Sequence, residues 1–531
     1  MTELLIVAII IMLVVVLVSC IAVLFINITY AYGDACALFS LVGNIRYFSI
    51  IDRCYATVST MEIENSLIPI SVLYNTPYVL FLNIIKWIPP KRRLRGSQIV
   101  NLFFFFLYLA SFFYLTRIIC LSLSLNTHTT FLICFIFTLL LSIRTKILFM
   151  CLLPQAEMIN YWLFNVALIL VHKIFLAQVQ WSVFLLGAVC GLMLRNKGTD
   201  IVFLLVVFFC LLVSGGGTSM VFLYFGGLSF VSLDSIFWII RGHSFNEYLK
   251  NIIINDVPGS EKRSIKKYIR LLLSGCVAML RLHRPDSLWP SLGSALIVGI
   301  LSTVYLMYMK VVSGSLMVII LFIPSYLIAS SFIRRININD QNGYYFGRRQ
   351  LYIIFPLLMV LNTVAFSILW NEGQTGFIYI YVFWAVCYFL YQFYRVLHYH
   401  FSDSITETGF YTYKKEIEPF RKDLADFLNS LTGSAVIMGF CLMWGEAYNY
   451  FDYSPEKKCI SVQNPVSDKD VRKLINFYNI THIVITPISF FVGPNCSLKD
   501  KTLSPVLKDI LIKEEITPEL TIYKVRETAI Q

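Results

Sequence analysis

The chain has 531 residues, of which 58% are hydrophobic and only 14% are charged, with a net charge of +12. Soluble domains are about 45–50% apolar and about 25% charged, so this composition excludes an ordinary soluble protein and predicts a polytopic membrane protein. The P-loop, the GxGxxG turn and the HExxH and GxSxG motifs are absent from the sequence, so it offers no signature of the enzymes that these motifs mark. Residues 401–531 carry 15 basic and 17 acidic side chains, so the positive excess lies before them. Basic residues near membrane spans commonly anchor cytoplasmic loops, and we expect no nucleic-acid partner.

Apolar windows of about 20 residues, the length that crosses a bilayer, recur as far as residue 397. They are Leu4–Ile26, Gln98–Cys120, Thr129–Cys151, Ile159–Val179, Trp181–Leu194, Ile201–Val213, Ser291–Met309, Ser315–Phe332, Leu351–Trp370 and Phe377–Leu397. Allowing for short or merged spans, they predict about ten to thirteen transmembrane helices. The first window is too long for the apolar region of a signal peptide and has no basic start, so we interpret it as a retained anchor.

Asp34 follows the first window in the stretch "YAYGDACALF", and two interpretations of it are open. An aspartate after Gly33 suits a helix N-cap, which residue type and spacing alone favour. The alternative is a carboxylate that acts as a general base beside the bilayer.

Two long, less apolar segments interrupt the windows, at about 27–97 and 235–290. We expect both to be extracytoplasmic juxtamembrane loops. In the second, lysines and arginines alternate with Ile and Leu at helical spacing, which fits either a helix in the membrane interface or a cytoplasmic basic loop.

Further charged residues stand at the boundaries of apolar windows. Glu157 opens one window in "LLPQAEMINYWLFN", Arg195 and Lys197 separate two windows in "GLMLRNKGTD", and Arg348 and Arg349 precede another in "GYYFGRRQLYIIFP". Charged groups in or beside lipid are default functional candidates, and an arginine can bind two oxygens of a phosphate. Ordinary interfacial solvation of the acid and positive-inside anchoring of the bases explain the same residues.

The composition shifts near Tyr399, and residues 401–531 predict a separate small domain. Helices are expected at 416–430, 467–479 and 503–514, with Ser467 as an N-cap, and strands at 434–440, 481–487 and 519–525. This alternation predicts a small α/β domain with a mainly parallel sheet. The expected fold is therefore a polytopic α-helical membrane domain, residues 1–400, followed by a C-terminal soluble α/β domain.

These elements together resemble the GT-C class of polytopic glycosyltransferases, in particular the bacterial relatives of protein O-mannosyltransferases and of lipid A aminoarabinose transferases. The resemblance covers nearly the whole chain. It rests on "GDACALFSLVGNI", "NTPYVLFLNIIKWI", "LLPQAEMINYWLF", "GLMLRNKGTDIVFLLVV" and "GRRQLYIIFPLLMVL", and on the closing α/β domain, which contains "THIVI" and "ELTIYKV".

The resemblance implies roles for two carboxylates. An acid near the start of the first extracytoplasmic loop corresponds to Asp34, and the proline-then-acid element that opens a later span corresponds to Glu157, although Ala156 replaces the usual Ser or Thr. Family members that glycosylate proteins often carry a second acid beside the first. Ala35 takes that place here, which puts a protein acceptor in doubt.

It also implies partners and a location. The donor would be a sugar on a polyprenyl phosphate, whose phosphate Arg195, Lys197, Arg348 and Arg349 would bind. The acceptor would be a glycan, lipid or protein of the cell envelope. The protein would lie in a bacterial inner membrane among membrane lipids, with its active site on the extracytoplasmic face. No cofactor is expected, and a divalent metal is left open because one or two carboxylates make a poor dedicated site.

The paired-acid mechanism sets a condition on topology. Asp34 and Glu157 share a face only if an even number of spans separates them. We expect the segment Leu67–Ile88, which contains prolines, asparagines and a lysine, to lie in the interface rather than to cross. The basic cluster at 91–95 then falls on the outer side, against the positive-inside bias.

Two other functions remain open on the sequence. A flippase or transporter of lipid-linked saccharides would use the same basic residues to guide phosphates without any chemistry. An O-antigen-type polymerase is also aromatic-rich and polytopic. The closing α/β domain favours the transferase over both.

Overall fold

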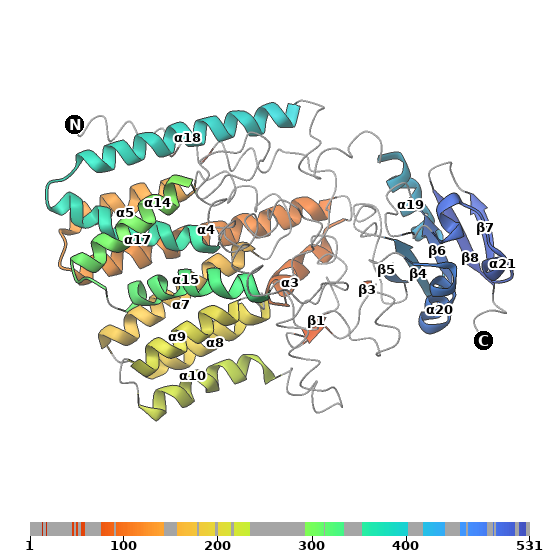
Figure 1. Ribbon diagram of the computed structural model, residues 1–531, viewed down its shortest axis with the longest axis horizontal. Coiled ribbons are helices and arrows are strands. Elements are labelled where there is room, and N and C mark those ends of the chain that lie inside the picture. The colour runs from red at the N-terminus through yellow and green to blue at the C-terminus, as the bar shows by residue number, and fades with distance from the viewer. Residues whose placement is uncertain are drawn as a thin grey trace.

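The computed structural model comprises a helical bundle and, at one end of it, a mixed sheet flanked by helices (Figure 1). It describes residues 13, 17, 45–46, 49–50, 55–58, 76–89, 92–142, 157–177, 180–196, 200–213, 217–233, 293–312, 314–333, 353–401, 418–440, 457–462, 466–485, 492, 495–515 and 520–526.

Ten long helices within these ranges form the bundle. They are α4 (Arg93–Ser122), α5 (Thr127–Ser142), α7 (Glu157–Ala177), α8 (Gln180–Asn196), α9 (Ile201–Val213), α10 (Thr218–Val231), α14 (Gly293–Tyr308), α15 (Ser315–Ile333), α17 (Ile354–Asn371) and α18 (Gly376–Phe401).

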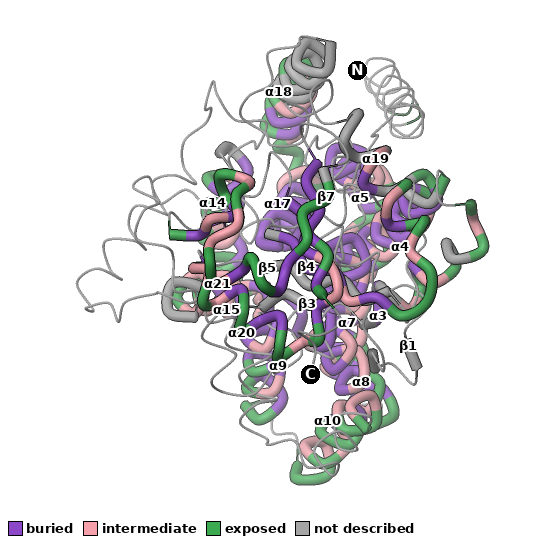
Figure 2. The backbone as a smooth tube through the Cα atoms, turned by 90° about the vertical axis from the view of Figure 1, so that its right-hand side faces the viewer, coloured by how far each residue is buried: buried purple, intermediate pink, exposed green. Residues whose placement is uncertain are grey.

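The surface of this bundle is apolar, as expected of helices in lipid. Phe222 on α10 is 77% exposed and Phe383 on α18 is 71% exposed, whereas α17 is buried along most of its length (Figure 2). Among the described residues, three helices, α4, α7 and α17, are long and apolar enough to span a bilayer, and several others are apolar but shorter. Large apolar side chains on the outside of an apolar bundle identify an integral membrane protein.

Most predicted windows coincide with observed helices, and α9 has the predicted bounds. The window Leu4–Ile26 and the segment 235–290 lie outside the described residues, apart from two single positions in the former. Helix α10 was not among the predicted windows.

The segment Leu67–Ile88, which the shared-face model requires not to cross the membrane, is described from Thr76. It forms α3 (Thr76–Leu82) and then a 3₁₀ turn, η2 (Asn83–Trp87). Seven residues of α-helix and five of 3₁₀ helix together extend about 20 Å, which is less than a bilayer core of about 30 Å. The described part of this segment is therefore not a membrane-spanning helix.

Helices α4 and α7 pack side by side in parallel. Phe104 lies against Trp162, Tyr108 against Tyr161, and Asn165 donates to the hydroxyl of Ser111 over 3.1 Å. From Tyr108 to Ser111 on α4 the partner on α7 advances from Tyr161 to Asn165, so the two helices run in the same direction. Both therefore begin at the same end of the bundle, with α5 between them.

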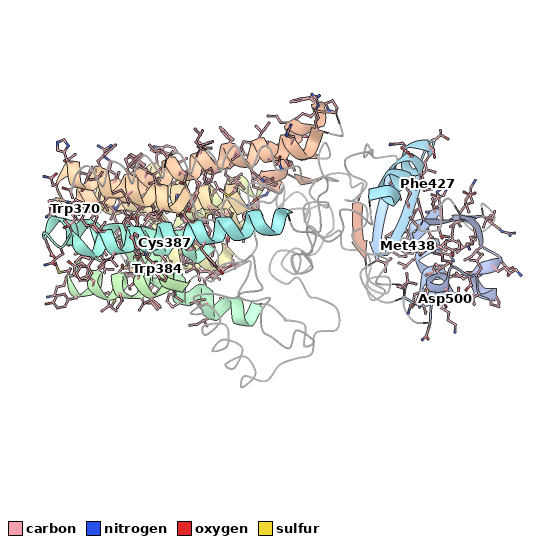
Figure 3. All side chains as sticks on the ribbon, turned by 90° about the horizontal axis from the view of Figure 1, so that it is seen from above. Trp370, Trp384, Cys387, Phe427, Met438 and Asp500 are labelled. Atoms are coloured by element: carbon pink, nitrogen blue, oxygen red, sulfur yellow. The ribbon has the colours of Figure 1, made fainter. Side chains whose placement is uncertain are left out.

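That end faces the sheet (Figure 1). The turn between α17 and α18 lies at the opposite end, where Figure 3 places Trp370, while Trp384 lies part-way along α18 on its return. We call the end that faces the sheet the sheet-facing end and its opposite the far end.

Helices α8 and α10 approach at backbone distance. A Cβ added to Gly187 would lie 1.9 Å from the carbonyl oxygen of Tyr224, and one added to Gly227 would lie 1.9 Å from that of Phe184. Close approach at small residues is the usual way in which transmembrane helices gain van der Waals contact. The two glycines thus fix α10 against α8.

The sheet has six strands in the order β3-β5-β4-β6-β8-β7. They are β3 (Tyr55–Val58), β4 (Ala435–Phe440), β5 (Lys457–Val462), β6 (His482–Ile485), β7 (Leu511–Glu515) and β8 (Thr521–Val525). The first four pair in parallel and the last two join antiparallel, which confirms a mainly parallel sheet.

Strand β3 comes from the first long loop rather than from the C-terminal region. It forms the edge of the sheet, and Tyr55 pairs with Cys459 in the register. Strand β3 of this loop therefore lies on the same side of the bundle as the C-terminal strands.

Local signals in the C-terminal region are mostly confirmed. Helix α19 (Glu418–Ser430) matches its prediction, and α20 (Asp468–Tyr478) begins at Ser467, which forms a capping box with Asp470. The predicted helix 503–514 is wrong. It is a single turn, α21 (Pro505–Lys508), followed by strand β7, because pairing with β8 holds these residues extended.

We predict that Gly187→Ala destabilises the protein, because the new methyl group would overlap a backbone carbonyl of α10 that has no side chain to move aside. Overpacking of this kind costs about 1–3 kcal/mol. Thermal unfolding of the detergent-purified protein measures the loss. Gly376→Ala is the matched control, since nothing lies within 4 Å of its added Cβ. Equal melting temperatures for the two variants would contradict the close packing.

The strand register predicts that Tyr55→Cys forms a disulfide with Cys459, its partner on β5. Neighbouring strands are about 4.8 Å apart, within the range of Cα distances that a disulfide bridges. Peptide mass spectrometry without reductant detects the bond. Ala56→Cys is the control, because adjacent strand positions project to opposite faces. Cross-linking of Ala56→Cys but not of Tyr55→Cys to Cys459 would refute the register.

Candidate functional site

Glu157 is the first residue of α7, at the sheet-facing end of the bundle, and only 3% of its side chain is exposed. Asn160, one helical turn later, is 1% exposed. Residues three apart lie on the same face of a helix, so the carboxylate and the amide are neighbours on α7. A buried acid at the start of a membrane helix is costly unless it has partners, and Glu157 does have interactions in the structure.

Helix α8 runs antiparallel to α7 and brings its last residues, Arg195 and Asn196, to the same end. Both are buried, and the guanidinium of Arg195 donates to the carbonyl of Val231, the last residue of α10, over 2.6 Å. Arg195 therefore ties the ends of α8 and α10 together.

Asp200 immediately precedes α9 and is 1% exposed. Its carboxylate accepts a 2.6 Å hydrogen bond from Nδ2 of Asn160, and Oδ1 of Asn160 accepts a 3.1 Å hydrogen bond from Nδ2 of Asn196. The chain of donors runs from α8 through α7 to the start of α9. We call these residues, with Glu157 and Arg195, the polar cluster.

More buried polar groups stand on α3 and α4. The hydroxyl of Tyr78 donates to Asn101 over 2.8 Å, and Ser97 and Gln98 are buried one turn earlier on α4. Since Phe104 packs on Trp162 and Tyr108 on Tyr161, Asn101 lies at about the same height along the bundle axis as Glu157. This end of the bundle is thus lined by polar groups on several helices.

The helix ends complement the charges of the cluster. Glu157 and Asp200 stand at the N-termini of α7 and α9, where the helix dipole stabilises negative charge. Arg195 stands in the last turn of α8, where the dipole favours a cation. Each of these three charged groups therefore stands at the helix end whose dipole favours its sign.

The structure brings Glu157 and Arg195 together and leaves the other predicted site residues unplaced. Asp34, Lys197, Arg348 and Arg349 lie outside the described residues. Lys197 falls between Asn196 and Asp200 in the sequence, and the two arginines fall a few residues before α17. In the part of the chain that the structure describes, no three His, Cys, Asp or Glu side chains are grouped as metal ligands would be.

Sequence reasoning missed Asn160, Asn196 and Asp200. All three stood inside the stretches already singled out, "QAEMINYW" and "RNKGTD". The signal was the one-turn spacing of Glu157 and Asn160, together with an acid directly before an apolar helix.

The architecture was compared with known structures. ArnT from Cupriavidus metallidurans bound to undecaprenyl phosphate matches with a TM-score of 0.52 over 98% of this chain and 99% of its own, at 11% sequence identity. The oligosaccharyltransferase of Archaeoglobus fulgidus, in complex with Zn and sulfate, gives a TM-score of 0.45 over 89% of this chain and 68% of its own, also at 11% identity. ArnT has the GT-C fold, and its match over nearly the whole of both chains shows that this chain has that fold. No family model and no curated protein matches the sequence.

We predict that Arg195→Gln lowers the thermal stability of the protein in detergent, because the shorter amide cannot reach the Val231 carbonyl. A hydrogen bond from a charged donor such as this one contributes about 1.5–3 kcal/mol. Arg92→Gln, at an exposed position before α4, is the control and should change stability by less than about 0.5 kcal/mol. An unchanged melting temperature for Arg195→Gln would show that the tie to α10 is dispensable.

Proposed function

We propose that this chain is a membrane glycosyltransferase that moves a sugar from a polyprenyl-phosphate carrier to a hydroxyl of an envelope glycan, lipid or protein. The observation that carries the proposal is a buried carboxylate, Glu157, at the sheet-facing end of a GT-C fold. The ArnT structure was bound to undecaprenyl phosphate, which supports a carrier of that kind.

In this proposal two carboxylates act on the acceptor. The oxygen of the acceptor hydroxyl attacks the anomeric carbon of the sugar while Asp34 takes the proton of that hydroxyl. Glu157 orients the hydroxyl by hydrogen bonding. The bond between the anomeric carbon and the phosphate oxygen breaks, and a single displacement inverts the anomeric configuration. Proton transfer to a positioned carboxylate contributes about 10²–10⁴-fold to a rate.

The leaving phosphate needs positive charge. Lys197, Arg348 and Arg349 are proposed to bind it, and Arg195 to supply charge from the end of α8. The direction of α17 supports this role for Arg348 and Arg349. Ser367, near the end of α17, contacts Cys120, near the end of α4, so the two helices run in the same direction. Helix α17 therefore begins at the sheet-facing end, a few residues after the two arginines in the sequence. Fixed donors at a developing phosphate charge are usually a large catalytic contribution.

The arrangement also supports a shared side for both acids. Strand β3 of the first loop pairs with β5. Helix α3 and the 3₁₀ turn η2 together are too short to cross the membrane, and α4 and α5 then form an antiparallel pair before Glu157. The proposed location is a bacterial inner membrane, with the site on the extracytoplasmic face and about ten to thirteen spans in all.

The test is mass spectrometry of cell-envelope glycans from the native host with and without this protein. We expect one sugar to be missing from the deletion strain and to return with the wild-type chain. Asp34→Ala and Glu157→Ala should each restore about 1% or less of it, since each removes a group that acts on the reacting hydroxyl.

Glu372→Gln is the matched control. This carboxylate lies near the far end, where the Tyr305 hydroxyl donates to it over 2.9 Å, and its substitution should leave sugar transfer unchanged. Full transfer by both Asp34→Ala and Glu157→Ala would instead favour a carrier of lipid-linked saccharides. A deletion strain with an unaltered glycan profile would overturn the proposal itself.

A further inference from the structure

Asn160 is the centre of a hydrogen-bond chain that joins three helix ends. It accepts from Asn196, the last residue of α8, and donates to Asp200, the residue before α9, over 3.1 and 2.6 Å. All three side chains are buried, with 0–1% of their surface exposed. Their amide and carboxylate groups therefore interact with the protein rather than with water.

The direction of the hydrogen bonds gives Asp200 a specific part in this chain. Both amides use Nδ2 as the donor, so the chain ends on a carboxylate, which can only accept. A hydrogen bond to a charged acceptor is stronger than one between neutral groups. Asp200 thus fixes the orientation of the Asn160 amide.

Asn160 in turn stands one turn after Glu157, on the same face of α7. Glu157 lies in the first turn, where a helix has no earlier turn of its own to hold it. A tie from Asn160 to the start of α9 therefore holds the part of α7 from which the Glu157 carboxylate projects.

We propose that Asp200 is a positioning residue for Glu157, which it serves by holding the first turn of α7 through Asn160. This inference rests on the proposed glycosyl transfer. Asp200 does not touch the substrate in this proposal, and its effect on the reaction passes through the placement of the Glu157 carboxylate.

The bundle offers a matched control for buried hydrogen bonds as such. The hydroxyl of Ser302 on α14 donates to Asn362 on α17 over 2.9 Å, and both residues are buried. This pair joins two helices as Asn160 and Asp200 do, but it does not involve α7. Asn362→Ala should affect folding stability without affecting transfer by Glu157.

The experiment uses the full-length protein purified in detergent. The donor is the polyprenyl lipid fraction of the native host, the acceptor is the envelope fraction of the deletion strain, and mass spectrometry measures the sugar transferred. The rate at saturating donor and the donor concentration at half-maximal rate are determined for Asp200→Ala, Asp200→Asn, Asn160→Ala and Glu157→Ala, for the double variant Glu157→Ala/Asp200→Ala, and for Asn362→Ala.

We expect Asp200→Ala and Asn160→Ala to lower the saturated rate about 10–100-fold, as displacement of a catalytic group by about 1 Å does. The half-saturating donor concentration should stay within about three-fold, because every residue proposed to bind the donor phosphate is kept. Asp200→Asn keeps an acceptor for Asn160 and should recover the rate to within about three-fold. In the Glu157→Ala background, Asp200→Ala should cost nothing further.

Several outcomes would overturn the inference. These are a normal rate for both Asp200→Ala and Asn160→Ala, a full additional loss in the double variant, and a loss in Asn362→Ala as large as in Asp200→Ala. If Asp200→Ala does not fold, Asn160→Ala tests the loss of rate, and a near-normal rate in Asp200→Asn tests the need for an acceptor at this position. A wild-type chain that transfers no sugar, or a Glu157→Ala variant at the wild-type rate, would instead refute the proposed function.

Discussion

The parallel packing of α4 on α7 is the contact on which the rest of the arrangement depends. Helix α5 follows α4 and runs antiparallel to it. It brings the chain back, so that α4 and α7 begin at the same end of the bundle. The aromatic pairs Phe104–Trp162 and Tyr108–Tyr161 fix their relative height. The buried polar residues at the start of α4 therefore stand near those at the start of α7.

Buried polar groups are costly in membrane helices, and the polar cluster of this protein lies at helix ends. Lipid offers no partner to an amide or carboxylate, so each must find one within the protein. At the sheet-facing end, the helix dipoles, the Arg195 link to Val231 and the amides of Asn160 and Asn196 supply those partners. The buried carboxylates of Glu157 and Asp200 therefore stand among groups that favour negative charge.

Helices of the bundle could be predicted from the sequence because each depends on its own apolar composition. Helix α10 escaped prediction because its 14 residues include glycines, serines and a tyrosine, and its stability comes from backbone contact with α8. Strand β7 was predicted as helix because its pairing with β8 is not visible in a local window. Glu157 could be found from its position, whereas Asp200 required knowing that the start of α9 lies beside Asn160. Each of these three features depends on contact with a distant segment of the chain, which a local stretch of sequence does not reveal.

The pairing of Tyr55 with Cys459 also bears on how the protein is made. Strand β5 leaves the ribosome roughly 400 residues after β3. At about 5–20 residues per second, β3 waits for tens of seconds with an unpaired edge. During that time the helices between the two strands must insert into the membrane. Because of this order of synthesis, β3 can pair with β5 only after the helices between them have been made. A chain that stops before residue 457 lacks the strand with which β3 of the first loop pairs.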